Sequence, residues 1–363
     1  MPKKKEQPQS GPTLWGTDLP FISLKPFVPT RAYLPLAQAD TLSPKALEKV
    51  PGFTYKPLPE PLNTIEYAPG TSLKQYGNYE ILHTTPESNT WSAQGLDAPF
   101  IVSLSGGLGS AVAAERAIQK NGRENILLWF ADVKKENADL YRFVHDVMDR
   151  FGGRLYYFTD GRRPEDVWDK RKIVPNNQIA PCFYELKVKP FRNFIQAMNH
   201  LPVVYIGYKP GEDERMSSTT ASYKEAIPEV TVDYPLLWRS AETRDLVAVC
   251  EEELGIQAPL LYKLGYEYNN CGGECCRAGI TSWVRTAESF PRRFDHMEDW
   301  ETEARNQGDA RANYTIAARS REGKKQPLPL SQIKEEYVPQ AETLYQREQT
   351  KRENARRRLQ DKP

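Results

Sequence analysis

The sequence predicts an α/β protein built on a doubly wound parallel sheet, with an extended N-terminal arm and a charged C-terminal tail. Three observations lead to this prediction. From about residue 98, short apolar runs alternate with helical segments of about 10–15 residues, which is typical of parallel strands covered by helices. A glycine-rich turn directly follows the first apolar run. The 363 residues, of which 39% are hydrophobic, suffice for one large domain with appendages.

The predicted strands are apolar runs, and the predicted helices are the segments between them. Strands are expected at residues 100–104, 126–132, 154–158, 203–208 and 230–237. Helices are expected at residues 110–120, 138–152, 182–200 and 241–255. The helix at 138–152 is the clearest, because it is amphipathic and ends at glycines. We expect Glu136 and Asp139 to cap it, since acids favour the first turn of a helix.

The regions on either side of this pattern differ in composition. Residues 1–60 are rich in Pro, Lys, Gln and Ser and are expected to form a partly disordered arm. Residues 61–97 hold aromatic and turn residues and are expected to cover the domain at 98–307. Residues 308–363 are expected to be a linker and a charged tail. Because acids interleave with bases after Arg347, a solvated tail is favoured over one that binds nucleic acid.

Charge, apolar content and cysteines exclude several classes of protein. The net charge of +1 gives no whole-chain argument for nucleic-acid binding. No apolar run reaches about 18 residues, so no membrane span is expected. The basic N-terminal residues are not followed by the apolar segment of a signal peptide, so no secretory signal is expected. Five cysteines, three of them within six residues, indicate a reducing compartment and a metal, cluster or redox site. We therefore expect a cytoplasmic protein.

The turn "SGGLGS" is the strongest candidate for a phosphate site. A Walker A loop is excluded because no lysine follows the glycines, and a dinucleotide fingerprint is weak because Val112 stands at the third glycine position. The turn instead has the Ser-Gly-Gly-x-x-Ser pattern of pyrophosphatase-type loops. Its glycines let the backbone approach an anion, and the freed amides and the helix start point at phosphates. The candidate ligands are Ser105, Gly106, Gly107, Gly109 and Ser110, with an ordinary strand-to-helix turn as the alternative.

Several blocks of the sequence carry a resemblance to a known family. They are "SGGLGS", "FADVKKENADLYRFV", "CFYELKVKPF", "YIGYKPGEDERM" and "NNCGGECCRAG", the last followed by "FPRRFDHMEDWE". In order and spacing they resemble the adenine nucleotide alpha hydrolase superfamily, and within it the proteins related to phosphoadenosine phosphosulfate (PAPS) reductase, many of them carried by bacteriophages. The resemblance covers roughly residues 98–305. It implies a HUP-like fold with the nucleotide at the carboxyl ends of the strands, and a host cytoplasm as location if a phage encodes the chain.

The resemblance assigns roles to four polar residues. It implies that Asp132, at the end of the second strand, contacts the adenosine half of the nucleotide. It also implies that Glu214 and Arg215 face the substrate and that Lys187 binds phosphate or sulfate, which makes these three the candidate catalytic residues. The residues themselves leave open a turn aspartate, a solvated charge cluster and a surface lysine.

Gly109 departs from the pattern of many ATP-using members of this superfamily. Those members carry an aspartate at this position, where it helps to organise magnesium and phosphate. The reductase branch varies at the same position, which favours reductase-like over synthetase-like relatives. Mg²⁺ is therefore a candidate cofactor without a carboxylate ligand at residue 109.

The resemblance also implies a role for the cysteines, since several relatives hold a [4Fe–4S] cluster on cysteine thiolates. The implied ligands are Cys182, Cys271 and Cys275, with Cys276 as the fourth. A redox or persulfide-transfer pair, zinc with mixed ligands and purely structural thiols remain alternatives. Cys250 lies on an apolar helix face and is expected to be buried and inert.

These features lead us to expect an enzyme that binds ATP or PAPS. The expected reaction is attack on the α-phosphate of ATP with release of pyrophosphate, coupled to sulfur transfer onto a nucleic acid or a small molecule from a thiol or sulfur donor protein. One alternative is a sulfonucleotide reductase, although no cysteine follows Cys276 to act as its C-terminal nucleophile. The other is a nucleotide-binding regulator or virion-associated protein without catalysis.

Overall fold

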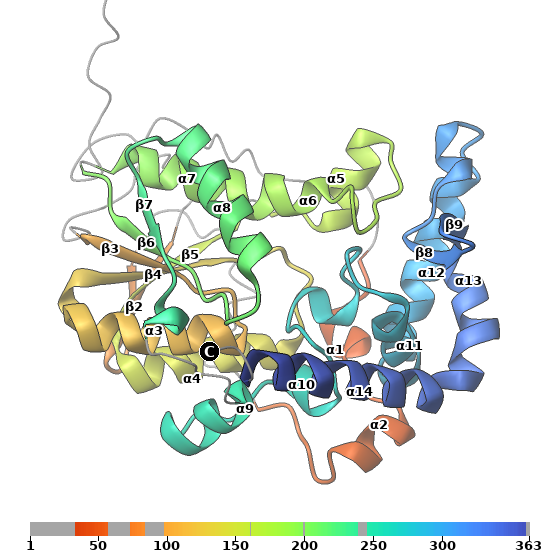
Figure 1. Cartoon of the computed structure of the whole chain (residues 1–363), viewed down its shortest axis with the longest axis horizontal. Coiled ribbons are helices and arrows are strands. Elements are labelled where there is room, and N and C mark those ends of the chain that lie inside the picture. Colours follow the sequence, from red (N-terminus) through yellow and green to blue (C-terminus); the bar gives the residue numbers. More distant parts are fainter. Residues whose placement is uncertain are drawn as a thin grey trace, which may run out of the picture.

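A computed structural model of the chain describes residues 33–56, 73–83, 98–159, 161–198, 200–238 and 245–360. Within these residues, a seven-stranded sheet has six neighbouring parallel strands and one antiparallel edge strand, β1 (Figure 1). The strands are β1 (Leu73–Tyr76), β2 (Tyr79–His83), β3 (Phe100–Ser103), β4 (Ile126–Ala131), β5 (Gly153–Phe158), β6 (Val203–Tyr205) and β7 (Thr231–Asp233). A separate hairpin pairs β8 (Ala317–Arg321) with β9 (Lys324–Leu328).

Helices cover the sheet and form a further layer beside it (Figure 1). The longer helices are α3 (Leu108–Asn121), α4 (Ala138–Phe151), α5 (Pro164–Arg171), α7 (Lys189–Ala197), α8 (Asp213–Ala226), α11 (Ile280–Ser289), α12 (Pro291–Arg305) and α14 (Ala341–Gln360). The shorter helices are α1 (Leu36–Ala39), α2 (Pro44–Lys49), α6 (Pro181–Phe183), α9 (Leu246–Ala248), α10 (Leu260–Lys263) and α13 (Leu330–Gln332). Single π-helical turns follow α6, α9 and α13, at Tyr184–Val188, Val249–Glu253 and Ile333–Tyr337. Short 3₁₀ turns lie at Arg123–Asn125, Pro235–Leu237, Cys271–Gly273, Ala310–Asn313 and Val338–Gln340.

The strand order of the sheet is β1-β2-β5-β4-β3-β6-β7, so the connection from β5 to β6 crosses the sheet to the other side of β3. From β3, the strands β4 and β5 continue to one side, whereas β6 and β7 lie on the other side. The carboxyl ends of β3 and β6 therefore meet at a topological switch point, the place where open α/β sheets bind ligands. The predicted parallel α/β architecture is confirmed by the six parallel strands and the helices that flank them.

Alternate side chains of β4 enter two cores, which explains why the whole strand is apolar. Leu128 and Phe130 pack with α3 and α4 on one face of the sheet. Leu127 and Trp129 pack with α7 and α8 on the other face. A strand buried on both faces reads as a continuous apolar run, as this one does.

The segment 308–340, which the sequence predicts as a linker, is instead part of a packed layer beside the sheet. Its residues Leu330 and Ile333 are fully buried in the same core as Trp283 and Phe294 of α11 and α12. The hairpin of β8 and β9 belongs to this layer, because Ala317 and Leu328 are buried in that core too.

Part of the predicted N-terminal arm is folded as well. Residues 33–56 include α1 and α2, and Ala46 and Val50 pack with Leu261 and Phe290 from the C-terminal half. The remainder of the predicted arm and cover segment, residues 1–32, 57–72 and 84–97, lies outside the described residues. Within the described parts of the chain, we find no helix with the length and apolar character that crossing a bilayer requires.

Candidate functional site

The glycine turn connects β3 to α3 and is held in shape by its second serine, Ser110. The buried Ser110 hydroxyl accepts a hydrogen bond from the Ser105 amide at 3.1 Å and donates one to the Gly107 carbonyl at 2.8 Å. Gly106 has a φ of +77°, and a β-carbon there would lie 2.7 Å from Leu140 Cγ, so only glycine fits. Ser110 and Gly106 therefore shape the turn, whereas Ser105 is exposed at its mouth.

The main chain of the turn faces a segment from the C-terminal half of the protein. Gly107 is the N-cap of α3 and offers no side chain to the first amides of that helix. The Tyr262 hydroxyl accepts a hydrogen bond from the Leu108 amide, and the Asn269 side chain donates to the Gly106 carbonyl at 2.8 Å. Burial raises the pKa of Tyr262 to about 12, so this hydroxyl is neutral near pH 7. Tyr262 and Asn269 thus form one wall of the turn.

Gly109 is a glycine because two loops touch at the switch point. A β-carbon on Gly109 would lie 2.5 Å from the carbonyl oxygen of Gly207, the residue that follows β6 by two positions. A β-carbon on Gly207 would in turn lie 2.4 Å from the Gly109 oxygen and 2.7 Å from the Ser110 nitrogen. No side chain fits at either position, so the aspartate of many ATP-using proteins has no room here.

Arg215 lies in the first turn of α8, beyond the carboxyl end of β6. It pairs with Glu212, and its guanidinium lies 4.5 Å from the Tyr208 ring centre and 5.9 Å from that of Tyr268. The Tyr268 side chain is 48% exposed, and Glu214 beside Arg215 is exposed too. Sequence reasoning missed both tyrosines, although Tyr208 belongs to one of the blocks that carry the resemblance. Arg215 and its two aromatic neighbours present a cation and stacking surfaces together.

Asp132 follows β4 and points into the protein. The Tyr141 hydroxyl donates to one carboxylate oxygen at 2.8 Å, and the Tyr157 hydroxyl donates to the other. Lys134 adds its backbone amide at 2.7 Å and its ammonium at 3.3 Å. Because Asp132 is only 2% exposed, its carboxylate organises the loop after β4 from within.

Glu136 joins that loop to the cysteines. The sequence predicts Glu136 as a cap of α4, but the side chain that caps this helix belongs to Asn137. Glu136 is fully buried and makes other contacts. One carboxylate oxygen lies 3.2 Å from Lys187 Nζ, and the other accepts a hydrogen bond from the Cys271 amide. Burial raises the pKa of Glu136, although the Lys187 charge opposes this effect. Burial lowers the pKa of Lys187, but the charge of Glu136 opposes this effect and the net result is a raised pKa, so Lys187 stays protonated.

The structure gathers all four cysteines that the sequence singled out. Cys182 in α6 contacts Cys276, Cys276 contacts Cys275, and Cys275 contacts Cys271, so the thiols form a row. None of them is in a disulfide bond. Cys250 lies apart, in the core between the sheet and α3 and α4, where burial raises its pKa to about 12. This placement agrees with the inert thiol predicted at Cys250.

Thiolate character is concentrated at Cys275. Hydrogen bonds from the Cys271 and Cys276 thiols, together with the Arg277 amide and the Lys187 charge, hold the pKa of Cys275 well below its usual range. Donation to neighbouring sulfurs and burial raise the pKa of Cys271 and Cys276. Cys275 is therefore the thiol of this row that most readily acts as a nucleophile or metal ligand.

The donor set has to be judged together with its arrangement. Four cysteine thiolates are donors that suit an iron–sulfur cluster or zinc. Among the described residues, however, no three or more His, Cys, Asp or Glu side chains are arranged to hold a metal ion. The thiols thus fit a metal by their chemistry and fit a metal-free row of hydrogen bonds by their present contacts.

A buried ionic network supports the cysteine loop from below. Arg293 donates to Asp40 at 2.9 Å and to Glu274 at 3.1 Å, and Lys135 lies 3.1 Å from the same Glu274. A β-carbon on Gly272, which has a φ of +58°, would lie 2.1 Å from Arg293 Nη1. The loop between the cysteines therefore rests directly on the Arg293 guanidinium. Through Asp40, the N-terminal arm contributes to the same support.

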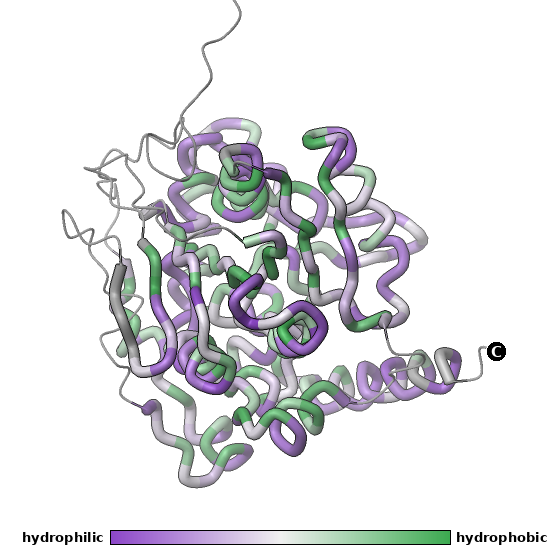
Figure 2. The backbone as a smooth tube through the Cα atoms, turned by 90° about the vertical axis from the view of Figure 1, so that its left-hand side faces the viewer, coloured by the Kyte–Doolittle hydropathy of each residue, from purple (hydrophilic) through white to green (hydrophobic). Residues whose placement is uncertain are grey.

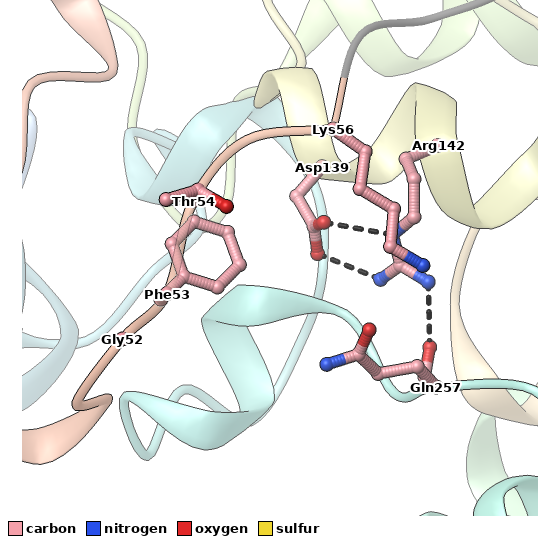
Figure 3. A pocket seen from close by; sticks show the side chains of 7 residues that line it. All are labelled: Gly52, Phe53, Thr54, Lys56, Asp139, Arg142 and Gln257. Carbon is pink, nitrogen blue, oxygen red and sulfur yellow. Dashed lines mark hydrogen bonds and ion pairs between the residues drawn. The ribbon is translucent and has the colours of Figure 1, made fainter.

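A hollow of about 200 Å³ lies between the N-terminal arm and α4 (Figure 3). Asp139, predicted as a helix cap, lies in the first turn of α4, where its carboxylate pairs with Arg142 at 2.8 Å in this hollow and accepts the Leu260 amide at 2.6 Å. The residues that line it are Gly52, Phe53, Thr54, Lys56, Asp139, Arg142 and Gln257. None of the candidate site residues named from the sequence lines this hollow, so it is distinct from the switch point.

Comparison with known proteins does not identify a function for this chain. No family model matches the chain, and no curated protein matches it. The arrangement of residues around the switch point and the resemblance of the motifs are therefore the two grounds for a function.

Proposed function

We propose that this protein is an adenine-nucleotide-dependent enzyme with a HUP-like fold, similar to the PAPS reductase-related proteins. The observation that carries the proposal is the short segment that joins the glycine turn to the row of cysteines. The Asn269 side chain holds the Gly106 carbonyl, and Cys271, two residues later, is the first cysteine of the row. A phosphate bound at the turn would therefore lie close to four thiols and to Lys187.

In the proposed complex the nucleotide lies at the carboxyl ends of β3 and β6. The backbone amides of Gly107 and Leu108 and the positive end of α3 receive the phosphates, with the Tyr262 hydroxyl shifting from the Leu108 amide to the ligand. Tyr268, which is half exposed, offers a stacking surface to the adenine ring. Arg215 lies beside it and neutralises the departing pyrophosphate.

The proposed reaction is attack by an acceptor oxygen on the α-phosphate of ATP, with loss of pyrophosphate. The turn amides stabilise the charge that develops on the phosphate. Neither Gly109 nor the fully engaged Asp132 offers a carboxylate to Mg²⁺, so we infer that the phosphates themselves hold any magnesium ion. This inference makes Arg215 and Lys187 the main cationic groups that the chain contributes.

A pyrophosphate-release assay with anaerobically prepared protein tests this reaction. Removing the Arg215 charge, in Arg215→Ala, is expected to slow release from ATP about 10- to 100-fold, the usual value of a charge-assisted contact. Arg321→Ala, at the exposed β8–β9 turn, is the matched control and should leave the rate unchanged. Nucleotide binding without turnover would favour the regulator instead, and sulfite release from PAPS would favour the reductase.

For the cysteine row we propose a [4Fe–4S] cluster as the first candidate, because the four thiols supply its donors. When bound, such a cluster supplies a redox or sulfur-binding centre next to the nucleotide. The specific observation that favours a second candidate, a metal-free nucleophilic thiolate, is the contact of Cys275 with Cys271 and Cys276.

Absorption spectra with iron and zinc analysis of anaerobic protein separate the two candidates. The cluster predicts a brown protein with about four irons per chain. Cys275→Ser should lose most of this iron, whereas the control Cys250→Ser should keep it, because Cys250 lies in a different core. A colourless wild-type protein without iron contradicts the cluster, and without zinc as well it supports the free thiolate.

A further inference from the structure

The first half of α14 is fixed to the body of the protein. The Tyr345 hydroxyl donates to Glu288 at 2.6 Å, and Arg285 lies 4.4 Å above the Tyr345 ring centre. Arg285 also pairs with Glu348 at 2.5 Å. Beyond this pair the helix runs away from the body, and its end projects as a rod in Figure 2.

Three cations share one side of this projecting helix. Arg347, Lys351 and Arg358 are exposed, and at 3.6 residues per turn they lie within about 40° of one another around the axis. They extend over roughly 16 Å along it. Among the described residues none of the three has a hydrogen-bond or ion-pair partner. We call these residues the α14 basic stripe.

The acids of α14 do not neutralise the α14 basic stripe. Glu348 faces the body, where it also receives a hydrogen bond from Arg352 at 3.1 Å. Glu342 and Glu353 lie on another side of the helix, roughly 150° from the stripe. The sequence favours a solvated tail because acids and bases interleave, but none of these three acids lies on the side of the helix that carries the stripe.

We propose that the α14 basic stripe binds the phosphate backbone of a nucleic-acid duplex. A duplex presents about one negative charge per 1.7 Å of its axis, so a row of cations over roughly 16 Å meets several phosphates at once. The side chains are long, and they lie on a helix held rigid at its base by Tyr345 and Glu348. The stripe is a local feature, since the whole chain has a net charge of only +1. It is independent of the proposed nucleotide site, because it needs neither ATP nor the cysteines.

Fluorescence anisotropy with a labelled 24-base-pair DNA duplex of mixed sequence tests this surface on the full-length protein. The variant Arg347→Gln/Lys351→Gln/Arg358→Gln removes the stripe, and glutamine keeps the helix because its helix propensity is similar. The matched control is Arg321→Gln/Lys324→Gln/Lys325→Gln, which removes the same charge from the exposed β8–β9 turn. Circular dichroism checks that both variants stay folded.

The stripe variant is expected to bind the duplex about a hundredfold more weakly at 0.1 M salt, with the slope of log K against log salt smaller by about 2.7. The control should bind like the wild type. An equal loss in both variants, or no duplex binding by the wild type at 0.05 M salt, overturns the proposal. So does stripe-dependent binding to vesicles with 30% phosphatidylserine without binding to the duplex, because the occupant would then be a membrane surface.

Discussion

β3 and β4 are neighbouring parallel strands, yet the loops that follow them differ in the groups that they present. The turn after β3 consists mainly of glycine and serine, and it presents main-chain amides at Gly107 and Leu108. The loop after β4 carries Asp132, Lys135 and Glu136, which are all buried and bonded to other parts of the protein. These buried polar side chains thus support the protein itself. We accordingly propose the main chain of the first loop, and not the carboxylates of the second, as the contact for a ligand.

The largest expected effect on stability comes from removing Arg293, the buried cation that supports the loop after β4. Arg293→Met leaves Asp40 buried without its cation and leaves Glu274 with Lys135 alone, so we expect the free energy of unfolding to fall by about 3–5 kcal/mol. Urea unfolding measures this change. The neighbouring Arg292→Met is the control and should change it by less than about 0.5 kcal/mol, because Arg292 is exposed. Similar values for the two variants would mean that the network does not hold the loop.

A smaller effect is expected at the contact that closes the first loop against β6. Gly109→Asp introduces the carboxylate of many ATP-using proteins, but its β-carbon would meet the Gly207 oxygen at 2.5 Å. We expect a loss of about 1–3 kcal/mol of stability, as for other overpacked sites. The control Gly279→Asp should be neutral or slightly stabilising, because Gly279 is an N-cap with open space around it. Urea unfolding that ranks the two variants equally would contradict the close contact.

The smallest expected effect compares two cysteines in different surroundings. Iodoacetamide at pH 7 should label Cys275 at least tenfold faster than Cys250, since only a thiolate reacts readily. The rate at Cys275 should rise with a midpoint below the usual thiol range, because neighbouring thiols lower its pKa, whereas burial raises the pKa of Cys250 to about 12. Peptide mass spectrometry of anaerobic, metal-depleted protein follows both sites. Equal rates at the two cysteines would contradict the proposed electrostatics.

The sheet was predictable because its strands carry their own signal. In the run at 126–132, every residue before Asp132 is apolar, and these six residues form β4 with all their side chains buried. The hairpin at 317–328 was not predictable in the same way, because only Ala317 and Leu328 at its two ends are buried. Most of its other side chains are polar and all of them are exposed or half-exposed, so they show no apolar alternation that would mark a strand.

The site was predictable in its residue types but not in its contacts. The glycine turn could be named from its pattern, whereas the resemblance was needed to join Cys182 to the three cysteines at 271–276. The role of Glu136 depends on Cys271, which is 135 positions away, and that of Arg293 depends on Asp40, which is 253 positions away. Pairings over such separations are decided by the fold. Local sequence therefore suggests helix capping for Glu136, and only the tertiary structure shows its contact.

The central claim, that main-chain amides of the turn hold an adenine nucleotide, is tested most directly by titration calorimetry with ATP and PAPS. Gly107 and Gly279 are both N-cap glycines with ordinary φ values, so Gly107→Val and Gly279→Val form a matched pair. We predict that the wild type and Gly279→Val bind one of the two nucleotides with micromolar affinity, and that Gly107→Val, which covers the amides, does not. Absence of binding by the wild type, or undiminished binding by Gly107→Val, would contradict the claim.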